Sequence, residues 1–399
     1  MMRISTATIF DQGAARINEQ TRQFQKVGDQ LASGRRVVNP SDDPQAASRA
    51  VGLQQSIAIS EQYADARVST RNSLSQQGSV LATVGDNITR AKVLITQASN
   101  GTLSDLDRQS VASELRGVYE SILGQANATD GNGRYLFAGY QDRSKPYVKD
   151  AAGSVNYVGD NNTQKVKVDD SRLMTNAENG AAVFNSVSTG AGYLAEQGAG
   201  NTGSLTFKGP DVLNANDPDF GNVFTINFVV DAAGPRYSVN GGPEVAFFEG
   251  SQIEFGGLGL TLEGSPADGD SFTVGKAVDM NTDLFRTLEK AVSALELNTD
   301  TDPNEATVKN TLKTVMRELS NSLDNVLTTQ ARIGSRLNEL DSIDAVADNR
   351  LINYKSSMSD LVDLNYTDAI SEYSRRQTGL QAAQKAFADM SKLSLFNYI

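Results

Sequence analysis

Both ends of this 399-residue chain carry apolar side chains at seven-residue intervals. This interval gathers the side chains into one stripe along a helix, and the stripe needs a partner surface to cover it. Stripes from the two ends can cover each other only where the termini lie together. We therefore predict a pair of terminal helices whose stripes contain Phe10, Ile17, Phe24 and Leu31 on one side, and Tyr366, Tyr373, Leu380 and Phe387, with Met390 at an intermediate position, on the other.

A pair of terminal helices is thin, because each helix has only the other to cover its apolar stripe. The apolar area left over favours association with further copies or with related chains. We therefore predict that the same nine residues form an assembly interface, and that the terminal helices serve assembly more than they serve the folding of one subunit.

Two start signals indicate long helices between the terminal stripes. Asp43 is followed by Pro44, which fits an N-cap carboxylate before a proline in the first helical position. Asp302 and Pro303 repeat this pattern, with Glu305 next in the first turn. No proline follows Pro303, and a seven-residue apolar stripe continues through Leu312, Leu319, Val326, Ile333, Leu340, Ala347, Tyr354 and Leu361. A third helix is predicted to begin at Ser104, where Asp107 completes a capping box.

The middle of the chain has a different pattern. Aromatic residues and valines at strand-like spacing predict a β-hairpin at roughly 134–158. Short β-like runs separated by Gly, Pro, Asn and Asp continue to about residue 280. Residues 151–280 hold 16 acidic and 6 basic side chains, a net charge of −10 within a chain total of −12, which suits a lobe facing water.

These patterns predict an α+β protein, an elongated rod of long helices with paired terminal helices, a β-hairpin and an inserted β-rich domain. Three parts are expected. Residues 1–40 with 362–399 would form a terminal helical coiled-coil domain. Residues 41–165 with 280–361 would form the long-helix rod domain that carries the hairpin, and residues 166–279 the inserted β-rich, solvent-facing domain.

Composition narrows the function. The chain has no Cys and no His, so thiolate metal sites and Cys- or His-based catalysis are excluded. The net negative charge disfavours binding to nucleic acid. No apolar run is long enough to insert in a membrane. We predict no catalytic residue, cofactor or metal. One rival remains, an enzyme whose site lies in the β-rich lobe and uses some of its acidic residues, such as Glu244, Glu249, Glu254 and Glu263.

The N-terminus lacks the apolar segment of a cleavable secretory signal.

Four segments together identify a family. They are LASGRRVVNPSDDPQAASRA at 31–50, GNGRYLFAGY at 131–140, NVLTTQARIGSRLNELD at 325–341 and the ending SLFNYI. The first resembles the N-terminal signature of the flagellin family. The other three resemble, within that family, the hook-filament junction proteins. The resemblance covers residues 1–170 and 280–399, and the lobe between them supports no inference.

The resemblance implies a structural protein of the bacterial flagellum. Such chains are exported unfolded through the flagellar type III apparatus, guided by an uncleaved N-terminal region and assisted by an export chaperone. They are secreted, and they self-associate in a ring between an adjoining hook-associated junction protein and flagellin. A flagellin that forms the filament itself is the alternative within the same family.

Overall fold

The computed structural model describes residues 6–101 and 103–396, with the side chains of residues 6, 7, 9, 302 and 390–396 outside that description. The chain divides into two compact units. The first contains the described residues of Met1–Asp65 and Ser342–Ile399, and the second those of Ala66–Asp341. Long helices and antiparallel sheets occur together, which confirms the predicted α+β class.

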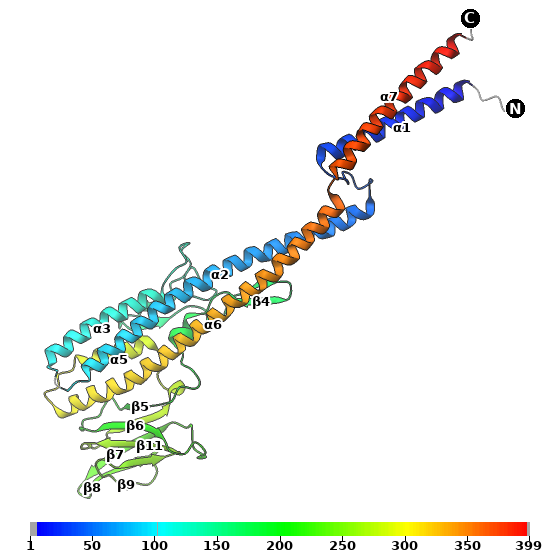
Figure 1. The fold of residues 1–399 in the computed structure, drawn as a ribbon. Helices are drawn as coiled ribbons and strands as arrows, with labels where there is room; N and C mark the ends of the chain where they lie inside the picture. The colour runs from blue at the N-terminus through cyan, green and yellow to red at the C-terminus, as the bar shows by residue number, and fades with distance from the viewer. Residues whose placement is uncertain (1–5, 102, 397–399) are drawn as a thin grey trace. The chain divides into compact units, whose positions relative to one another are not determined.

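The first unit is helical. Helix α1 (Thr6–Ser33) and helix α7 (Tyr366–Phe396) run side by side, although they come from opposite ends of the chain (Figure 1). The unit also contains the beginning of α2 (Pro44–Ala98) and the end of α6 (Asp302–Val362). The predicted pairing of N-terminal and C-terminal helices is therefore present.

The second unit contains a helical core. It is built from the remainder of α2 and α6 together with α3 (Asp105–Ala126) and α5 (Leu284–Leu295). The seven-residue stripe of α6 is buried here, as the sequence predicted, at Leu312, Leu319, Val326, Ile333 and Leu340. Helix α2 also contributes fully buried residues, namely Leu74, Leu81, Val84, Ile88, Ala91, Leu94 and Ile95.

The helix starts follow local chemistry. Ser104 and Asp107 form the predicted capping box at α3, each side chain accepting from the backbone N–H of the other. The Asp283 carboxylate caps α5 by accepting from the N–H of Phe285 at 2.8 Å. Helix α6 begins at Asp302 itself, one residue earlier than predicted. The side chain of Asp302 lies outside the described residues, so its capping role stays a prediction.

The hairpin predicted over 134–158 is shorter than expected. Only β1 (Tyr147–Lys149) and β2 (Val155–Tyr157) pair, in antiparallel register. The preceding segment is a loop with an isolated antiparallel bridge between Tyr135 and Thr129, and the Gln77 side chain holds it to helix α2. Its Nε2 donates to the carbonyls of Leu136 at 2.6 Å and Glu178 at 3.0 Å. This bonding buries Leu136, Phe137 and Ala138 without a strand partner.

A second small hairpin and a short helix follow. Strands β3 (Lys165–Asp169) and β4 (Arg172–Thr175) pair with each other, and α4 covers Gly180–Phe184. The hairpin contacts the long helices, since Arg67 donates to the Val168 carbonyl and Arg172 forms an ion pair with Glu339. Four buried aromatic rings join this region to α5, namely Phe137, Tyr147, Phe184 and Phe285.

The β-rich lobe contains two antiparallel sheets. The five-stranded sheet has the order β5-β12-β7-β8-β9, with β5 Tyr193–Gln197, β12 Ser271–Lys276, β7 Phe224–Asp231, β8 Gly234–Val239 and β9 Val245–Ala246. The three-stranded sheet has the order β10-β11-β6, with β10 Gln252–Phe255, β11 Leu258–Glu263 and β6 Thr206–Val212. A 3₁₀ turn, η1 (Ala277–Asp279), follows β12.

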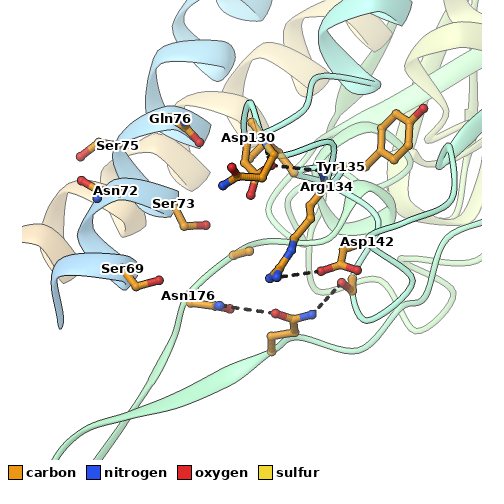
Figure 2. A pocket seen from close by; sticks show the side chains of 15 residues that line it. Ser69, Asn72, Ser73, Ser75, Gln76, Asp130, Arg134, Tyr135, Asp142 and Asn176 are labelled. Carbon is orange, nitrogen blue, oxygen red and sulfur yellow. Dashed lines mark hydrogen bonds and ion pairs between the residues drawn. The ribbon is translucent and has the colours of Figure 1, made fainter. Parts of the chain in front are cut away.

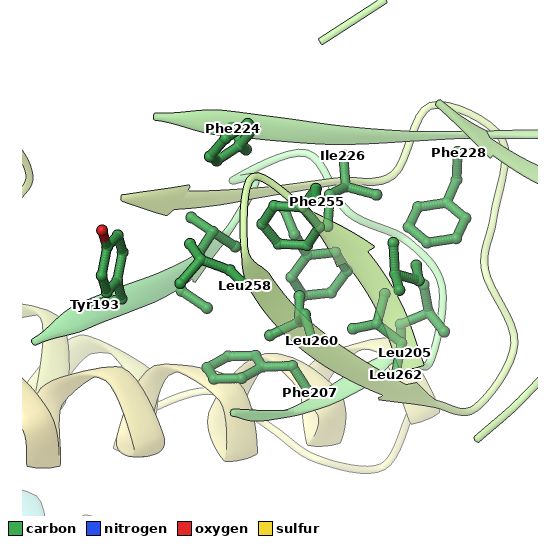
Figure 3. Close-up of a cluster of buried hydrophobic side chains, with 14 of the residues drawn as sticks. Tyr193, Leu205, Phe207, Phe224, Ile226, Phe228, Phe255, Leu258, Leu260 and Leu262 are labelled. Atoms are coloured by element: carbon green, nitrogen blue, oxygen red, sulfur yellow. The ribbon is translucent and has the colours of Figure 1, made fainter. Parts of the chain in front are cut away.

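The two sheets enclose one apolar core, in which aromatic and leucine side chains interlock (Figure 3). Because alternate residues of a strand face the same side, Leu258, Leu260 and Leu262 of β11 all enter this core. The described core members begin at Tyr193 and end at Val274. The three-part domain division, with its boundary at residue 166, stays a prediction.

Helix α6 closes two sheet edges with polar side chains. The Asn310 carboxamide accepts from the N–H of Phe207 at 3.1 Å and donates to the carbonyl of Leu205 at 2.8 Å, both at the β6 edge. The Thr314 hydroxyl donates to the Ala195 carbonyl of β5 at 2.6 Å. Edge strands usually expose unpaired backbone groups, so this helix takes the place of a further strand.

Candidate assembly surfaces

The paired terminal helices bring the predicted interface residues together. The rings of Phe10 and Phe387 lie 4.8 Å apart, and those of Phe24 and Tyr373 lie 4.7 Å apart. Aromatic pairs at this spacing attract each other beyond the effect of buried area alone. The described stripe residues are partly buried at Ile17, Phe24, Leu31, Tyr373, Leu380 and Phe387. The side chain of Met390 lies outside the described residues.

The helix pair leaves much apolar surface uncovered. Phe10 remains 52% exposed and Tyr366 remains 53% exposed, although both belong to the predicted stripes. Ile370 adds a further exposed apolar side chain on α7. Within the described parts of α1 and α7, the apolar side chains that count as buried are Val27 and Ala369. A second protein surface could therefore still cover a large part of these stripes.

The first unit also exposes apolar side chains on its other two helices. Val51 on α2 is 67% exposed, and Val346 and Ile352 on α6 are similarly open. A partner that covers such residues removes their apolar surface from water, which stabilises the complex by about 25 cal/mol per Å² buried. These residues lie outside the seven-residue stripes of the two chain ends, so that spacing did not predict them.

The chain passes between the terminal helices and the long helices at two crossings, one between α1 and α2 and the other between α6 and α7. These two crossings are hydrogen-bonded to each other. The N–H of Arg36 donates to the Val362 carbonyl at 2.7 Å, and the N–H of Leu364 donates to the Gly34 carbonyl at 3.0 Å. The Arg36 guanidinium also reaches the Leu361 carbonyl at 2.8 Å. Gly34 has φ of 69° and lies against the Tyr366 hydroxyl, so a larger residue would clash there.

Two acidic residues secure the first crossing. Asp43 stands directly before Pro44, and its carboxylate accepts from the N–H of Ala46 at 3.0 Å and pairs with Arg36 at 3.2 Å. The pKa of Asp43 is lowered mainly by the hydrogen bond from the Ala46 N–H, and next by the hydrogen bond from Arg36. The Asp42 carboxylate accepts from backbone N–H groups and pairs with Lys26 at 2.9 Å, which likewise lowers its pKa.

The second unit contains a polar cleft of about 480 Å³ between α2 and the 130–142 loop (Figure 2). Ser69, Asn72, Ser73 and Gln76 line one wall because their spacing places them on one face of the helix. The opposite wall is a loop and strand region that includes Asp130, Arg134, Asp142, Gln164 and Asn176. The guanidinium of Arg134 and the carboxylate of Asp142 are 3.9 Å apart.

Three of the four acidic residues considered for a site in the lobe have partners in different places. Glu244 pairs with Arg236, Glu249 accepts from the N–H of Gly264, and Glu263 pairs with Lys208. Glu254 is exposed on β10. Among the described residues, no three acidic side chains are grouped in a way that could hold a metal ion. No helix in the described part of the chain is long and apolar enough to cross a bilayer.

Comparisons with known proteins agree on one family. Residues 4–142 match the bacterial flagellin N-terminal helical region. The chain is 34% identical to flagellar hook-associated protein 3 of Escherichia coli (strain K12) over 396 residues, which is 99% of both chains. It is 32% identical to the protein of the same name from Salmonella typhimurium (strain LT2), again over 99% of both chains.

A solved structure extends the similarity to the fold. The crystal structure of FlgL from Xanthomonas campestris is 29% identical and matches with a TM-score of 0.67, covering 77% of this chain and 99% of that one. The family resemblance expected from the four sequence segments is thereby confirmed. The chain belongs to the flagellar hook-associated protein 3 family.

Proposed function

We propose that this protein is a structural subunit of the bacterial flagellum that joins the hook to the flagellin filament. The observation that carries the proposal is the incompletely covered α1–α7 pair, in which Phe10 and Tyr366 each keep more than half of their surface exposed. A helix pair with such stripes is suited to packing against copies of itself. Membership of the hook-associated protein 3 family supports the same role.

The finer parts of the role follow from this proposal. Several copies form a ring through the terminal stripes, with Phe10, Phe24, Tyr373 and Phe387 at the contacts between subunits. An adjoining hook-associated protein lies on one side of the ring and flagellin on the other. The chain is exported to the cell exterior, accompanied by an export chaperone. The protein has no catalytic activity, and the lobe carboxylates act as ordinary surface charges.

Negative-stain imaging of cells that lack the gene tests the proposal. We expect intact hooks without attached filaments, together with unpolymerised flagellin in the medium. Reintroducing the gene should restore attached filaments. If the protein were instead the filament subunit, the same deletion would leave no flagellin in the medium at all. Normal filaments in the deletion strain would refute both roles.

A further inference from the structure

The loop Asp130–Arg134 presents an Asn-Gly step to solvent at the edge of the polar cleft. The Asp130 carboxylate closes the loop by accepting from the N–H groups of Asn132 at 2.9 Å and Arg134 at 3.1 Å. Gly131 and Gly133 have φ of 78° and 81°, a region that suits glycine. This bonding holds the loop open, and Asn132 is exposed at its tip.

An Asn-Gly step can modify itself. The backbone nitrogen of the glycine attacks the carboxamide carbon of the asparagine, so that a new C–N bond forms and ammonia leaves. Water then opens the five-membered ring to give aspartate or isoaspartate. The reaction needs a glycine nitrogen with room around it and no acceptor holding its proton.

Gly133 meets these requirements. A Cβ atom placed on it would find no other atom within 4 Å. No hydrogen bond from its N–H is found among the described residues. We propose that Asn132 is a site of spontaneous deamidation, whose product places a new carboxylate beside the cleft.

The step Asn179–Gly180 is a natural control, because the fold blocks the same reaction there. The Asn179 carboxamide accepts from the N–H of Ala182 at 2.8 Å and donates to the Asn161 carbonyl at 2.6 Å. The N–H of Gly180 donates to the Phe137 carbonyl at 2.8 Å. Asn179 is also 5% exposed, so these bonds would have to break in a buried place.

The step Asn240–Gly241, in a hairpin turn, is a second control that tests the asparagine alone. Gly241 is as open as Gly133, and no hydrogen bond from its N–H is found among the described residues, but Asn240 is held by its own bonds. The Asn240 carboxamide oxygen accepts from the N–H of Thr225 at 2.7 Å, and the Asn240 N–H donates to the Thr225 carbonyl at 2.8 Å. These bonds hold Asn240 at φ of 51°. The remaining step, Asn100–Gly101, adjoins Thr102, which lies outside the described residues.

Deamidation would change the charge of the cleft. Asp130 and Asp142 already line it, and Arg134 is the cation among its lining residues. A carboxylate at position 132 adds a further negative charge beside them. The modified protein should therefore elute later from an anion-exchange column than the fresh protein.

Peptide mapping of the full-length protein, incubated at mildly alkaline pH, tests the proposal. The peptide with Asn132 should gain the mass of an amide-to-carboxyl change about tenfold faster than the peptides with Asn179 or Asn240, since a single hydrogen bond is worth about one factor of ten. In denaturant the three rates should become similar. An Asn132 rate no higher than the other two in the folded protein would overturn the proposal, as would the same ranking in denaturant.

The variant Asn132→Gln provides a further check, because its longer side chain disfavours the five-membered ring. Its circular dichroism should match that of the parent, and its 132-containing peptide should lose the mass gain while the Asn240 peptide is unchanged. Persistence of the gain in that peptide would place the reaction at another residue and refute the assignment.

Discussion

Glu318 is one of the most buried carboxylates of the second unit, at 2% exposure. The Thr287 hydroxyl donates to it at 2.9 Å, and the Lys290 ammonium lies 3.3 Å away while also pairing with Glu196 at 2.5 Å. One partly buried cation thus serves two carboxylates. Burial raises the pKa of Glu318, and the attraction of Lys290 only partly opposes this effect.

The raised pKa of Glu318 predicts a pH dependence of stability. A carboxyl group with a higher pKa in the folded chain binds its proton more tightly there, so the free energy of unfolding rises as pH falls from neutral toward the ordinary value of 4.5. The variant Glu318→Gln lacks this contribution. We expect its unfolding free energy, measured in urea relative to the parent, to decrease steadily over that pH range. A difference independent of pH would show that Glu318 titrates as it does in the unfolded chain.

Phe24 is predicted to matter for assembly more than for folding. Its ring packs on Tyr373 but is only partly buried. Truncating a buried phenylalanine to alanine lowers the free energy of unfolding by at least roughly 3 kcal/mol, and we expect Phe24→Ala to lower it by less. Motility should fall sharply, while the main calorimetric transition, which reports the second unit, stays in place. Gln25→Ala, at an exposed neighbour, is the matched control. A large drop in melting temperature would assign Phe24 to the folding core instead.

At the level of elements, the sequence predicted helices better than strands. Helix starts are encoded locally, as in the Ser104–Asp107 box, and a long stripe such as that of α6 repeats its signal many times. Strands β5 and β8 have weak local signals, because Tyr193–Gln197 and Gly234–Val239 contain residues that do not favour strands. Their neighbours in the sheet, β12 and β7, supply the pairing.

The candidate assembly surface was predicted only in part. Heptad spacing was enough to pair α1 with α7, since both stripes can be read directly from the chain. The hydrogen bonds between the two crossings could not be predicted, because they join backbone groups such as Arg36 N–H and the Val362 carbonyl, which any residues supply. The polar cleft was also missed, since its walls come from segments without a shared motif.

The closure of the sheet edges by α6 gives a prediction for Asn310. The variant Asn310→Ala should leave the N–H of Phe207 and the carbonyl of Leu205 buried without partners, at a cost of about 1–3 kcal/mol. Urea unfolding measures this loss, and amide exchange at Phe207 should accelerate. Lys309→Ala, one residue away and exposed, should change stability by less than about 0.5 kcal/mol. Equal effects of the two variants would mean that the Asn310 bonds contribute nothing.

At the scale of the whole molecule, we predict that the long helices fold without the β-rich lobe. The lobe has its own apolar core, and the chain enters and leaves it at paired residues, Leu194 and Gly275, on neighbouring strands. Removing residues 195–274 and joining the two ends by a short Gly-rich turn keeps Leu194 with its neighbours Val187 and Ala277. Because the joined residues are already adjacent, closing the turn adds little entropic cost.

We expect the shortened chain to keep its helical circular dichroism and to restore attached filaments in cells that lack the full-length protein. The Asn310 and Thr314 side chains lose their strand partners, but they become solvated, since the strands that covered them are gone. A variant with the same deletion plus Leu319→Ala, which opens a cavity in the helical core, should fail to fold and serves as the control. Loss of the helical signal in the simple deletion would show that the lobe is needed to complete the core of the long helices.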